Sequence, residues 1–378
     1  MPPMVIDLRR ADDSRDVVHR AVQALAEGRL VVFPTETDYV IAASGRCGAA
    51  VAALERLATR REREPALSLV PRSSDEALDW APRMPAIGKR ISRRCWPGPV
   101  ALIVPDDHAE SLVHRLPAAA RAGIVADGRL RLRLPGHPLL GDCLLMLAGP
   151  VVLAEPGGPG GGPAVEVADA LAAGGELALA IDDGRARYAQ PPSTILVEGE
   201  SFQMVRPGVV SEETVRRLAS LVVLFVCTGN TCRSPMAEAV FRALVAERLG
   251  CKPDDVERHG VVVVSAGVAA WPGGRASEHA VTVAREHGGD LESHESQPLT
   301  QALVRQADLI LTMTESHRAA LVTQFPEAGG RVTLLSPERQ DVIDPIGGSL
   351  DTYRRCARQI RGHLAARLDT LLQDVPRG

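Results

Sequence analysis

The sequence is poor in lysine and in aromatic residues. Lys89 and Lys252 are its two lysines, so arginine carries nearly all of the positive charge, which is typical of GC-rich codon usage. Aromatic residues make up 3% of the chain, which disfavours a surface on which nucleic-acid bases stack. The formal net charge of -4 provides no global basic field. The composition therefore gives no strong signal for nucleic-acid binding.

Metal-binding cysteine patterns and long apolar runs are missing as well. The seven cysteines form no C-x-x-C pair and no Cys/His cluster, so we expect no metal site and a reducing, cytoplasmic compartment. Residues 1–16 are charged early and contain no apolar stretch, so we expect no signal peptide. The apolar run at 221–226 is far too short to span a bilayer, and we expect no membrane contact. The oligomeric state stays open.

The chain divides into two α/β segments. Its 378 residues are enough for two or three domains. We assign a first domain to 4–211, a short helical linker to 212–220 and a second domain to 221–378. The first domain opens with a helical apolar pattern at 17–25, followed by a strand that ends at Pro34.

A Gly/Pro-rich tract interrupts the first domain between Glu155 and Glu166. Such a tract cannot be a helix or a central strand. A glycine-rich phosphate cradle is the alternative, but no helix-opening Lys-Ser/Thr follows the tract. We therefore expect a surface loop.

The second domain alternates buried strands with helices. Strands are predicted at 221–226, 261–265 and 308–313, and helices at about 235–249, 276–287, 315–323 and 352–373. This order predicts an α/β fold with a doubly wound parallel sheet.

The first of these strands leads directly into the sequence CTGNTCRSP and a helix. The loop 227–234 therefore lies between a strand end and a helix N-terminus, where α/β sheets bind ligands and backbone N–H groups bind anions. The same groups favour the thiolate form of Cys227, a strong nucleophile. Arg233 can hold two phosphate oxygens, Ser234 can donate to the thiolate, and Asn230 can brace the loop. A lone C-x5-R pattern is weak and an isolated cysteine is commonly a buried apolar residue, but this context favours a catalytic site.

Displacement at phosphorus also needs an acid that protonates the leaving group. Asp344 is the candidate: Pro345 stiffens its loop, and Gly347 and Gly348 allow a close fit. Taken alone, an Asp-Pro pair is more often a simple turn, so this assignment depends on the other motifs.

Four pieces of the second domain together resemble the low-molecular-weight protein phosphatase family. They are CTGNTCRSPMAEAV from Cys227, SAG at 265–267, DLILTMT at 308–314 and DPIGGSLDTY from Asp344, in the family's usual order and spacing. The resemblance covers nearly all of 221–373. It implies a phosphorylated protein as the partner and no cofactor.

The resemblance also implies roles for single residues. Cys227 becomes the nucleophile, Arg233 the phosphate clamp, and Asp344 the general acid and later the base. Ser234 stabilises the thiolate, and Cys232 can form a reversible disulfide with the nucleophile under oxidation. The remaining loop residues bind or support the phosphate: Thr228, Gly229, Asn230 and Thr231.

Two positions bear on the substrate. Family members that act on phosphotyrosine tend to carry a bulky apolar residue before the second loop cysteine and aromatic residues after the Asp-Pro pair. Here these positions hold Thr231 and Ile346, and the loop with DP-x-GGS resembles the protein-arginine phosphatases. A threonine hydroxyl suits a polar guanidinium, whereas an aliphatic residue suits a flat ring. We expect phosphoarginine, with phosphotyrosine as the alternative, although Ile346 departs from the aromatic residue usual in both groups.

Five pieces of the first domain, in order, resemble the threonylcarbamoyl-adenylate synthase family, which uses threonine, bicarbonate and ATP to make a precursor of a tRNA modification. They are VVFPTETDYVIAAS, WPGPVALIV, RLPGHP, PSTILV and VRPGVVS. The resemblance implies a twisted α/β sheet, described as a double-stranded-RNA-binding type of fold, with a wide basic site and ATP as a ligand if the domain is active. The matching site residues are Thr35, Tyr39, Arg60, Ser193 and Arg206.

Two departures weaken that site. Ala58 stands where the family has a lysine, and Glu155 begins the segment that replaces Ser-Ala-Asn. A lost lysine and an added carboxylate remove contacts to a polyphosphate. Arg61 and Arg63 could compensate, though a solvated helix face is their expected place. We predict a domain that keeps the fold and has lost or altered synthase activity; a bifunctional enzyme is the alternative, and two purely binding domains are disfavoured by the complete phosphatase motif.

Overall fold

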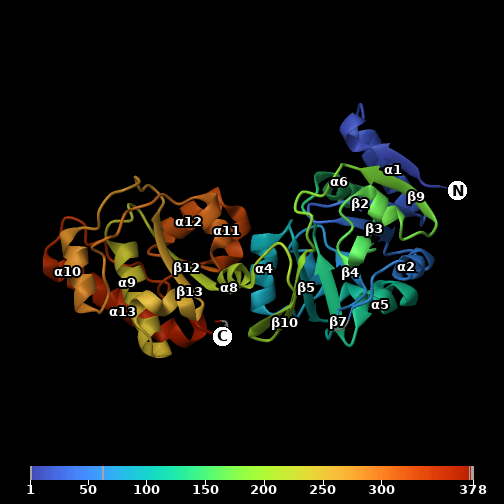
Figure 1. Cartoon of the computed structure of the whole chain (residues 1–378). Helices are drawn as coiled ribbons and strands as arrows, with labels where there is room; N and C mark the ends of the chain where they lie inside the picture. Colours follow the sequence, from blue (N-terminus) through green and yellow to red (C-terminus); the bar gives the residue numbers. More distant parts are fainter. Residues whose placement is uncertain (1, 62–63, 374, 376–378) are drawn as a thin grey trace. The chain divides into compact units, whose positions relative to one another are not determined.

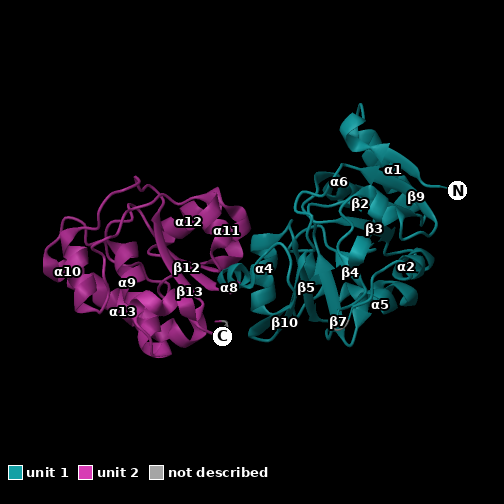
Figure 2. Ribbon diagram, in the orientation of Figure 1, with its two compact units in different colours: residues 1–218 teal, residues 219–378 magenta. Residues whose placement is uncertain are grey.

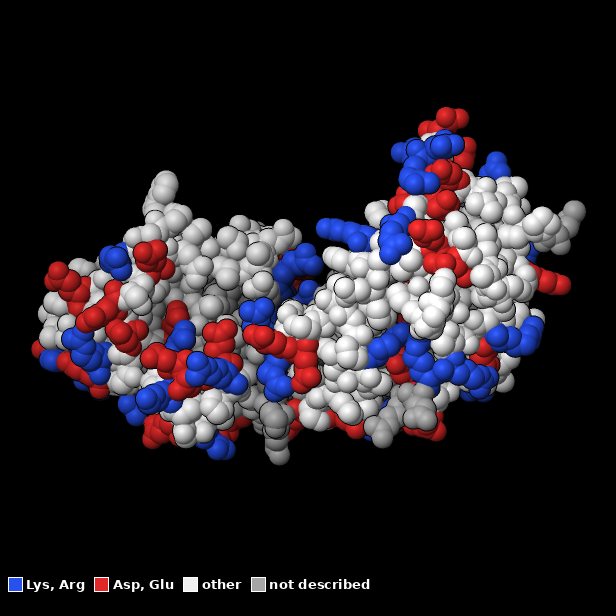
Figure 3. All heavy atoms as spheres, viewed as in Figure 1, with Lys and Arg blue, Asp and Glu red and all other residues white. Residues whose placement is uncertain are grey.

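The computed structural model describes residues 2–61, 64–373 and 375, which fall into two compact units, Met1–Leu218 and Ala219–Gly378 (Figures 1 and 2). Each unit is built around its own β-sheet. Acidic and basic side chains are interspersed over each unit on the face drawn in Figure 3. Among the described residues, helices that combine the length and the apolar character needed to cross a bilayer do not occur.

Unit 1 contains, within the described residues, an 11-stranded mixed sheet in the order β1-β9-β2-β3-β8-β4-β7-β5-β10-β11, with β6 paired to β7. The strands are β1 (Met4–Asp7), β2 (Leu30–Pro34), β3 (Tyr39–Ser44), β4 (Leu67–Val70), β5 (Val100–Pro105), β6 (Val125–Ala126), β7 (Arg129–Arg133), β8 (Val151–Ala154), β9 (Leu177–Asp182), β10 (Ser193–Glu198) and β11 (Ser201–Arg206). The helices are α1 (Ser14–Ala26), α2 (Gly48–Glu55), α3 (Ala77–Trp80), α4 (Ala86–Cys95), α5 (Ala118–Ile124), α6 (Pro138–Met146), α7 (Val167–Leu171) and α8 (Glu212–Ala219), which runs into unit 2.

The start of unit 1 follows from local chemistry. The Asp13 carboxylate accepts the backbone N–H of Arg15 and caps α1, whose apolar face is buried. β2 is buried along its whole length and pairs antiparallel with β3. The predicted helix at 17–25 and the predicted strand ending at Pro34 are both confirmed.

The Gly/Pro tract is a loop, as predicted, with one short turn of 3-10 helix, η3 (Pro159–Gly161). Gly160 and Gly161 have φ of 68° and 80°, a left-handed conformation that glycine adopts without strain. Glu155, the residue that precedes the glycines and prolines of the tract, is not on the surface: its exposure is 5%.

Unit 2 contains a parallel four-stranded sheet in the order β13-β12-β14-β15 within its described residues. The strands are β12 (Leu221–Cys227), β13 (Val261–Gly267), β14 (Leu309–Thr312) and β15 (Val332–Leu334). The helices are α9 (Arg233–Leu249), α10 (Glu278–Glu286), α11 (Gln301–Gln306), α12 (Glu315–Gln324) and α13 (Leu350–Leu371), with 3-10 turns at Pro253–His259 and Pro326–Arg331.

Alternate residues of β12 serve two cores. Val223 and Phe225 pack in a cluster with α9, α10 and α13, whereas Leu224 and Val226 pack with residues of α11 and α12. Helices therefore cover both faces, which confirms the predicted doubly wound parallel sheet. The sequence missed α11 and β15, because six and three residues are too short to show a period.

Candidate active site

The centre of the site is the loop between β12 and α9. Cys227 is the last residue of β12 and is 2% exposed, and α9 begins at Arg233. Asn230 holds the loop from inside with φ of 55°, the left-handed region that asparagine tolerates. Its Nδ2 donates to Ser234 Oγ at 3.0 Å and to Ser265 Oγ at 2.8 Å, and its Oδ1 accepts the N–H of Gln297 at 2.9 Å.

Two donors converge on the Cys227 sulfur. The backbone N–H of Asn230 points at Sγ from 3.3 Å, and Ser234 Oγ lies 3.0 Å from the same atom. Ser234 also contacts the carbonyl of Ala266 at 3.3 Å. Ser234 Oγ accepts from Asn230, and its one hydrogen, which can be donated to the Ala266 carbonyl, can turn to the sulfur instead. This environment is suited to a thiolate.

The end of β13 supports the loop from the side. The N–H groups of Val268 and Ala269 donate to the carbonyls of Cys227 and Thr228, each at 2.9 Å. A Cβ atom on Gly267 would lie 2.4 Å from the Thr228 carbonyl oxygen, so this position accepts only glycine without a shift of the loop. The SAG motif is thus the support of the loop.

Arg233 joins the loop to Asp344. Its side chain is 8% exposed, and one terminal nitrogen lies 2.7 Å from Asp344 Oδ2 and 3.3 Å from Thr228 Oγ1. The Asp344 carboxylate is 45% exposed, and its other oxygen accepts the N–H of Ile346 at 3.2 Å. Arg233 and Asp344, 111 positions apart in sequence, are therefore in direct contact.

The sequence analysis missed His317, at the start of α12. Its Nε2 lies 2.8 Å from Thr228 Oγ1 and its Nδ1 lies 2.7 Å from Thr314 Oγ1. Since Thr228 Oγ1 accepts from Arg233, its hydrogen points to Nε2, and Nδ1–H then donates to Thr314. Burial, together with the charge of Arg233, lowers the pKa of His317 to about 4, so the ring is neutral as this chain of bonds requires.

The second cysteine of the loop is free and buried. Cys232 Sγ lies 3.2 Å from Tyr353 Oη and 3.6 Å from Ser277 Oγ. Burial raises the pKa of Tyr353, and the hydrogen bond to Cys232 adds to that shift. Tyr353 therefore offers its hydroxyl as a hydrogen-bond partner for this sulfur.

The rim of the loop is open to solvent. Thr228 is exposed, Gly229 and Thr231 are half-buried, and Ile346 is 71% exposed. A second rim residue, Trp271, was missed from the sequence and is 86% exposed. Its segment is fixed to the loop at both ends, through Ala269 N–H to Thr228 and through Ser277 N–H to Thr231.

Unit 1 contains a separate cluster of buried charges around Glu155. Four arginines contact this one carboxylate, at 2.5 Å (Arg131), 2.6 Å (Arg206), 3.1 Å (Arg61) and 3.5 Å (Arg133). Burial by itself would raise the pKa of Glu155, but the arginines hold it well below its usual range. A cavity of about 120 Å³ adjoins the cluster and is lined in part by the Gly/Pro tract.

The residues expected in the unit 1 site are only partly brought together. Thr35 Oγ1 accepts from Arg133 at 3.1 Å, and Arg206 binds both Glu155 and Thr194. Ser193 Oγ instead bonds the backbone of Val210.

Tyr39 and Arg60 also lie elsewhere. The Tyr39 hydroxyl donates to the carbonyl of Gly184 at 2.5 Å, and burial raises its pKa. Arg60 is 76% exposed and pairs with Glu55, five residues earlier. The neighbouring Arg61 makes the contact to Glu155 in its place, contrary to the solvated position expected for it. Arg63 lies outside the described residues.

Each of the two units matches a family of known proteins. Residues 222–377 match the family model described as low molecular weight phosphotyrosine protein phosphatase, and residues 23–208 match the Sua5/YciO/YrdC model described as telomere recombination. A protein-arginine-phosphatase of Bacillus subtilis is 44% identical over 137 residues, 35% of this chain and 85% of that protein. The probable low molecular weight protein-tyrosine-phosphatase EpsP of Ralstonia nicotianae is 36% identical over 140 residues, 37% of this chain and 88% of that protein.

Among solved structures, a mutant of YwlE from Bacillus subtilis is 41% identical, covering 40% of this chain and 99% of that chain, with a TM-score of 0.35. Through its second unit the chain belongs to the low-molecular-weight protein phosphatase family, whose members are cysteine-dependent hydrolases, and its first unit is a Sua5/YciO/YrdC-type domain.

Proposed function

We propose that the second unit hydrolyses phosphoarginine in a protein substrate through a phosphocysteine intermediate, with Cys227 as nucleophile, Arg233 as phosphate clamp and Asp344 as general acid and base. The observation that carries this proposal is the contact between Arg233 and Asp344 beside a sulfur that two donors address. This contact supports an anion-binding loop with a carboxylate beside its arginine.

The reaction follows in two displacements. The Cys227 thiolate attacks phosphorus, the P–N bond breaks, and Asp344 gives its proton to the departing guanidine nitrogen. Water then attacks the phosphocysteine, Asp344 takes a proton from it, and the P–S bond breaks to release phosphate and the thiolate. The arriving phosphoryl group competes for the Arg233 donors, and the released Asp344 carboxylate takes up a proton from solvent, which it then gives to the leaving group. These steps need no cofactor.

The choice of phosphoarginine rests on the rim. Thr231 is half-buried beside the nucleophile, and two of the similar proteins, from Bacillus subtilis and Geobacillus stearothermophilus, are protein-arginine phosphatases. The tyrosine phosphatases among the similar proteins make phosphotyrosine the second candidate.

Phosphate release from matched phosphoarginine and phosphotyrosine peptides tests the choice, with Cys227→Ser as the blank. We expect a preference for phosphoarginine and a shift toward phosphotyrosine in Thr231→Ile. A wild-type preference for phosphotyrosine would refute the substrate and keep the mechanism. An unchanged ratio in Thr231→Ile would refute the role of Thr231.

For the first unit we propose a binding module without synthase activity. Glu155 occupies four arginines, and Ala58 provides no charge for a polyphosphate. A bifunctional enzyme that also makes threonylcarbamoyl-adenylate is the alternative, and ATP would then be its ligand. Calorimetric titration with ATP and threonine separates the two: tight binding of both with release of pyrophosphate would refute the proposal.

We propose domain limits of 4–211 and 221–378, with a linker at 212–220. We also propose a reducing, cytoplasmic compartment, because the mechanism needs Cys227 as a free thiolate. Cys232 is proposed as its partner in a reversible protective disulfide. The partner molecule is a phosphorylated protein.

A further inference from the structure

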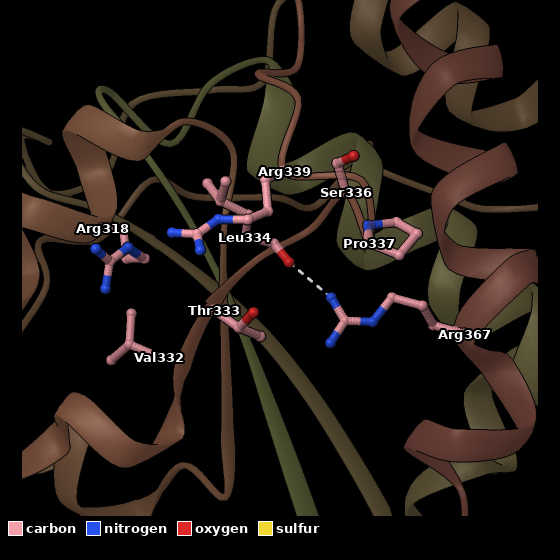
Figure 4. Close-up of a pocket in the computed structure, with 8 residues that line it drawn as sticks. All are labelled: Arg318, Val332, Thr333, Leu334, Ser336, Pro337, Arg339 and Arg367. Carbon is pink, nitrogen blue, oxygen red and sulfur yellow. Dashed lines mark hydrogen bonds between the residues drawn. The ribbon is translucent and has the colours of Figure 1, made fainter.

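Unit 2 has a second basic cavity that takes no part in the reaction described above. It measures about 480 Å³ and is lined in part by Arg318, Arg339 and Arg367 (Figure 4). The three arginines come from α12, from the loop after β15 and from α13; Figure 4 draws Arg318 and Arg339 near one another, and Arg367 across Thr333 and Leu334 from them. Cys227 and Arg233 do not line it. We propose that this cavity binds a small organic phosphate.

The charge balance favours an anion. Glu315 Oε1 accepts hydrogen bonds from Nε and one terminal nitrogen of Arg318, at 2.8 and 2.6 Å. Glu338, which contacts Ser336 at the cavity, and Asp341, which accepts the N–H of Glu315, are the other carboxylates of this region. Among the described residues, Arg318 is the one arginine of the three that forms an ion pair with a carboxylate, which leaves the guanidinium groups of Arg339 and Arg367 for an anion. Phosphate is the anion that such forked donors match best.

Arg367 carries the strongest argument. One of its terminal nitrogens donates to the carbonyls of Leu334 and Leu335, at 2.6 and 3.2 Å, which fixes the side chain against β15. Within the part of the chain that the structure describes, this arginine has no carboxylate partner. Burial lowers its pKa, so the protein carries a partly desolvated cation here at a cost in free energy. A bound anion would offset that cost.

Arg339 adds a conformational signal. Its φ is 61°, a left-handed backbone that is unfavourable for a side chain with a Cβ. Its guanidinium forms no hydrogen bond or salt bridge among the described residues, and Figure 4 draws it pointing toward Arg318. Its charge still acts on Glu315, whose pKa is lowered first by the hydrogen bond to Arg318 and in smaller part by Arg339. The strained turn therefore presents an unused fork to the cavity.

The size and lining select an organic phosphate over a bare ion. The volume of about 480 Å³ lies in the range of small-molecule sites, well above what one inorganic ion needs. Val332 and Pro337 add apolar surface, while Thr333 and Ser336 add hydroxyl groups. A ligand with a phosphate group and a carbon body of nucleotide size would use both.

The test must separate this cavity from the other anion sites of the chain. We would titrate the full chain carrying Arg233→Ala, which removes the catalytic clamp, with ADP and with inorganic phosphate by calorimetry. ADP should bind at least about tenfold more tightly than phosphate, and adding Arg339→Ala or Arg318→Ala should weaken ADP by about tenfold each, as expected for one lost charge-assisted contact. Arg258→Ala, an arginine 84% exposed outside the cavity, is the matched control and should bind as the parent does.

Three results would overturn the proposal. One is no ADP binding by the Arg233→Ala chain at millimolar concentration. Another is ADP affinity that neither Arg318→Ala nor Arg339→Ala changes, with binding lost instead on Arg206→Ala, which would move the ligand to unit 1. The third is equal affinity for ADP and inorganic phosphate, which would mean that only a bare ion binds.

Discussion

His317 provides the sharpest test of the catalytic geometry, because it touches no reacting atom and acts through Thr228. We expect His317→Leu to break the bonds from the ring to Thr228 and to Thr314, at 2.8 and 2.7 Å. Each such bond contributes about 1 kcal/mol net, so their loss removes up to about 2 kcal/mol of positioning. If all of it acts in the transition state, kcat/KM falls by about thirtyfold.

His317→Gln is the conservative partner of this variant. A glutamine amide oxygen reaches about as far as Nε2 and can accept the same hydrogen from Thr228. We expect His317→Gln to keep kcat/KM within about fivefold of wild type, which one hydrogen bond of about 1 kcal/mol allows. The exposed His259→Gln is the matched control and should not change the rate.

The assay is initial-rate phosphate release between pH 4 and 8, with kcat and KM resolved separately. Because the folded pKa of His317 is about 4, below its ordinary value, the ring stays neutral and the rate profile above pH 5 should show no limb from His317. The same shift means that the unfolded chain binds the extra proton first, so this part of the stability of unit 2 is present above about pH 6.5 and is lost as pH falls toward 4. Equal rates in His317→Leu and wild type would refute the positioning role, as would equal damage in the leucine and glutamine variants.

Three further predictions concern the two carboxylates Asp344 and Glu155 and the glycine Gly267. Asp344→Asn should lower kcat by about 10²–10⁴-fold, with phosphate binding more tightly because the pair with Arg233 is gone; an unchanged kcat would remove Asp344 from catalysis. Gly267→Ala would place a Cβ 2.4 Å from the Thr228 carbonyl oxygen, so the loop must shift, and activity should fall at least about tenfold while near-native circular dichroism remains; full activity would show that the loop yields. Glu155→Ala should lower the free energy of unfolding of unit 1 by about 3–5 kcal/mol in denaturant titration, against no change in the exposed control Glu110→Ala. In wild type the contribution of Glu155, whose pKa is lowered, is present above about pH 4 and should fade as pH falls further; a flat acid profile would contradict it.

The sequence predicted the catalytic loop because its information is local. A strand end, a helix start and the C-x5-R-S order lie within fifteen residues, and the structure keeps that order from Cys227 to Ser234. Asp344 could be proposed only with the family resemblance, since an isolated Asp-Pro pair has many explanations. The contact of Asp344 with Arg233 depends on where the loop between β15 and α13 packs, which no local pattern encodes.

Other residues were missed for reasons that can be named. His317 follows β14, whose end lies beside the end of β12, and polar residues at neighbouring strand ends were a usable signal. Arg131 and Arg133 alternate with leucines on β7, which places both on one face of a buried strand. Arg60 illustrates the opposite error. Its spacing from Tyr39 predicted a place in the site, but its side chain is exposed and pairs with Glu55, and the next residue, Arg61, contacts Glu155 instead.

The two units contain the same kind of interaction, a carboxylate paired with arginine, with different consequences for ligand binding. In each, a carboxylate of the chain occupies arginine donors that family resemblance assigns to a ligand. Asp344 makes one contact with one arginine and is 45% exposed, although Arg233 itself is buried, so we expect a dianionic phosphoryl group to displace it from this half-exposed pair. Glu155 is 5% exposed and is held by four arginines, so its removal would leave Arg131 and Arg206 with only their longer contacts to Glu64, at 3.7 and 3.6 Å, and Arg133 with Asp38. We therefore expect the first carboxylate to be displaced and to act as the proposed acid, whereas the second is part of the core. A ligand that competes for the same arginines is accordingly expected to bind in the second unit and not in the first.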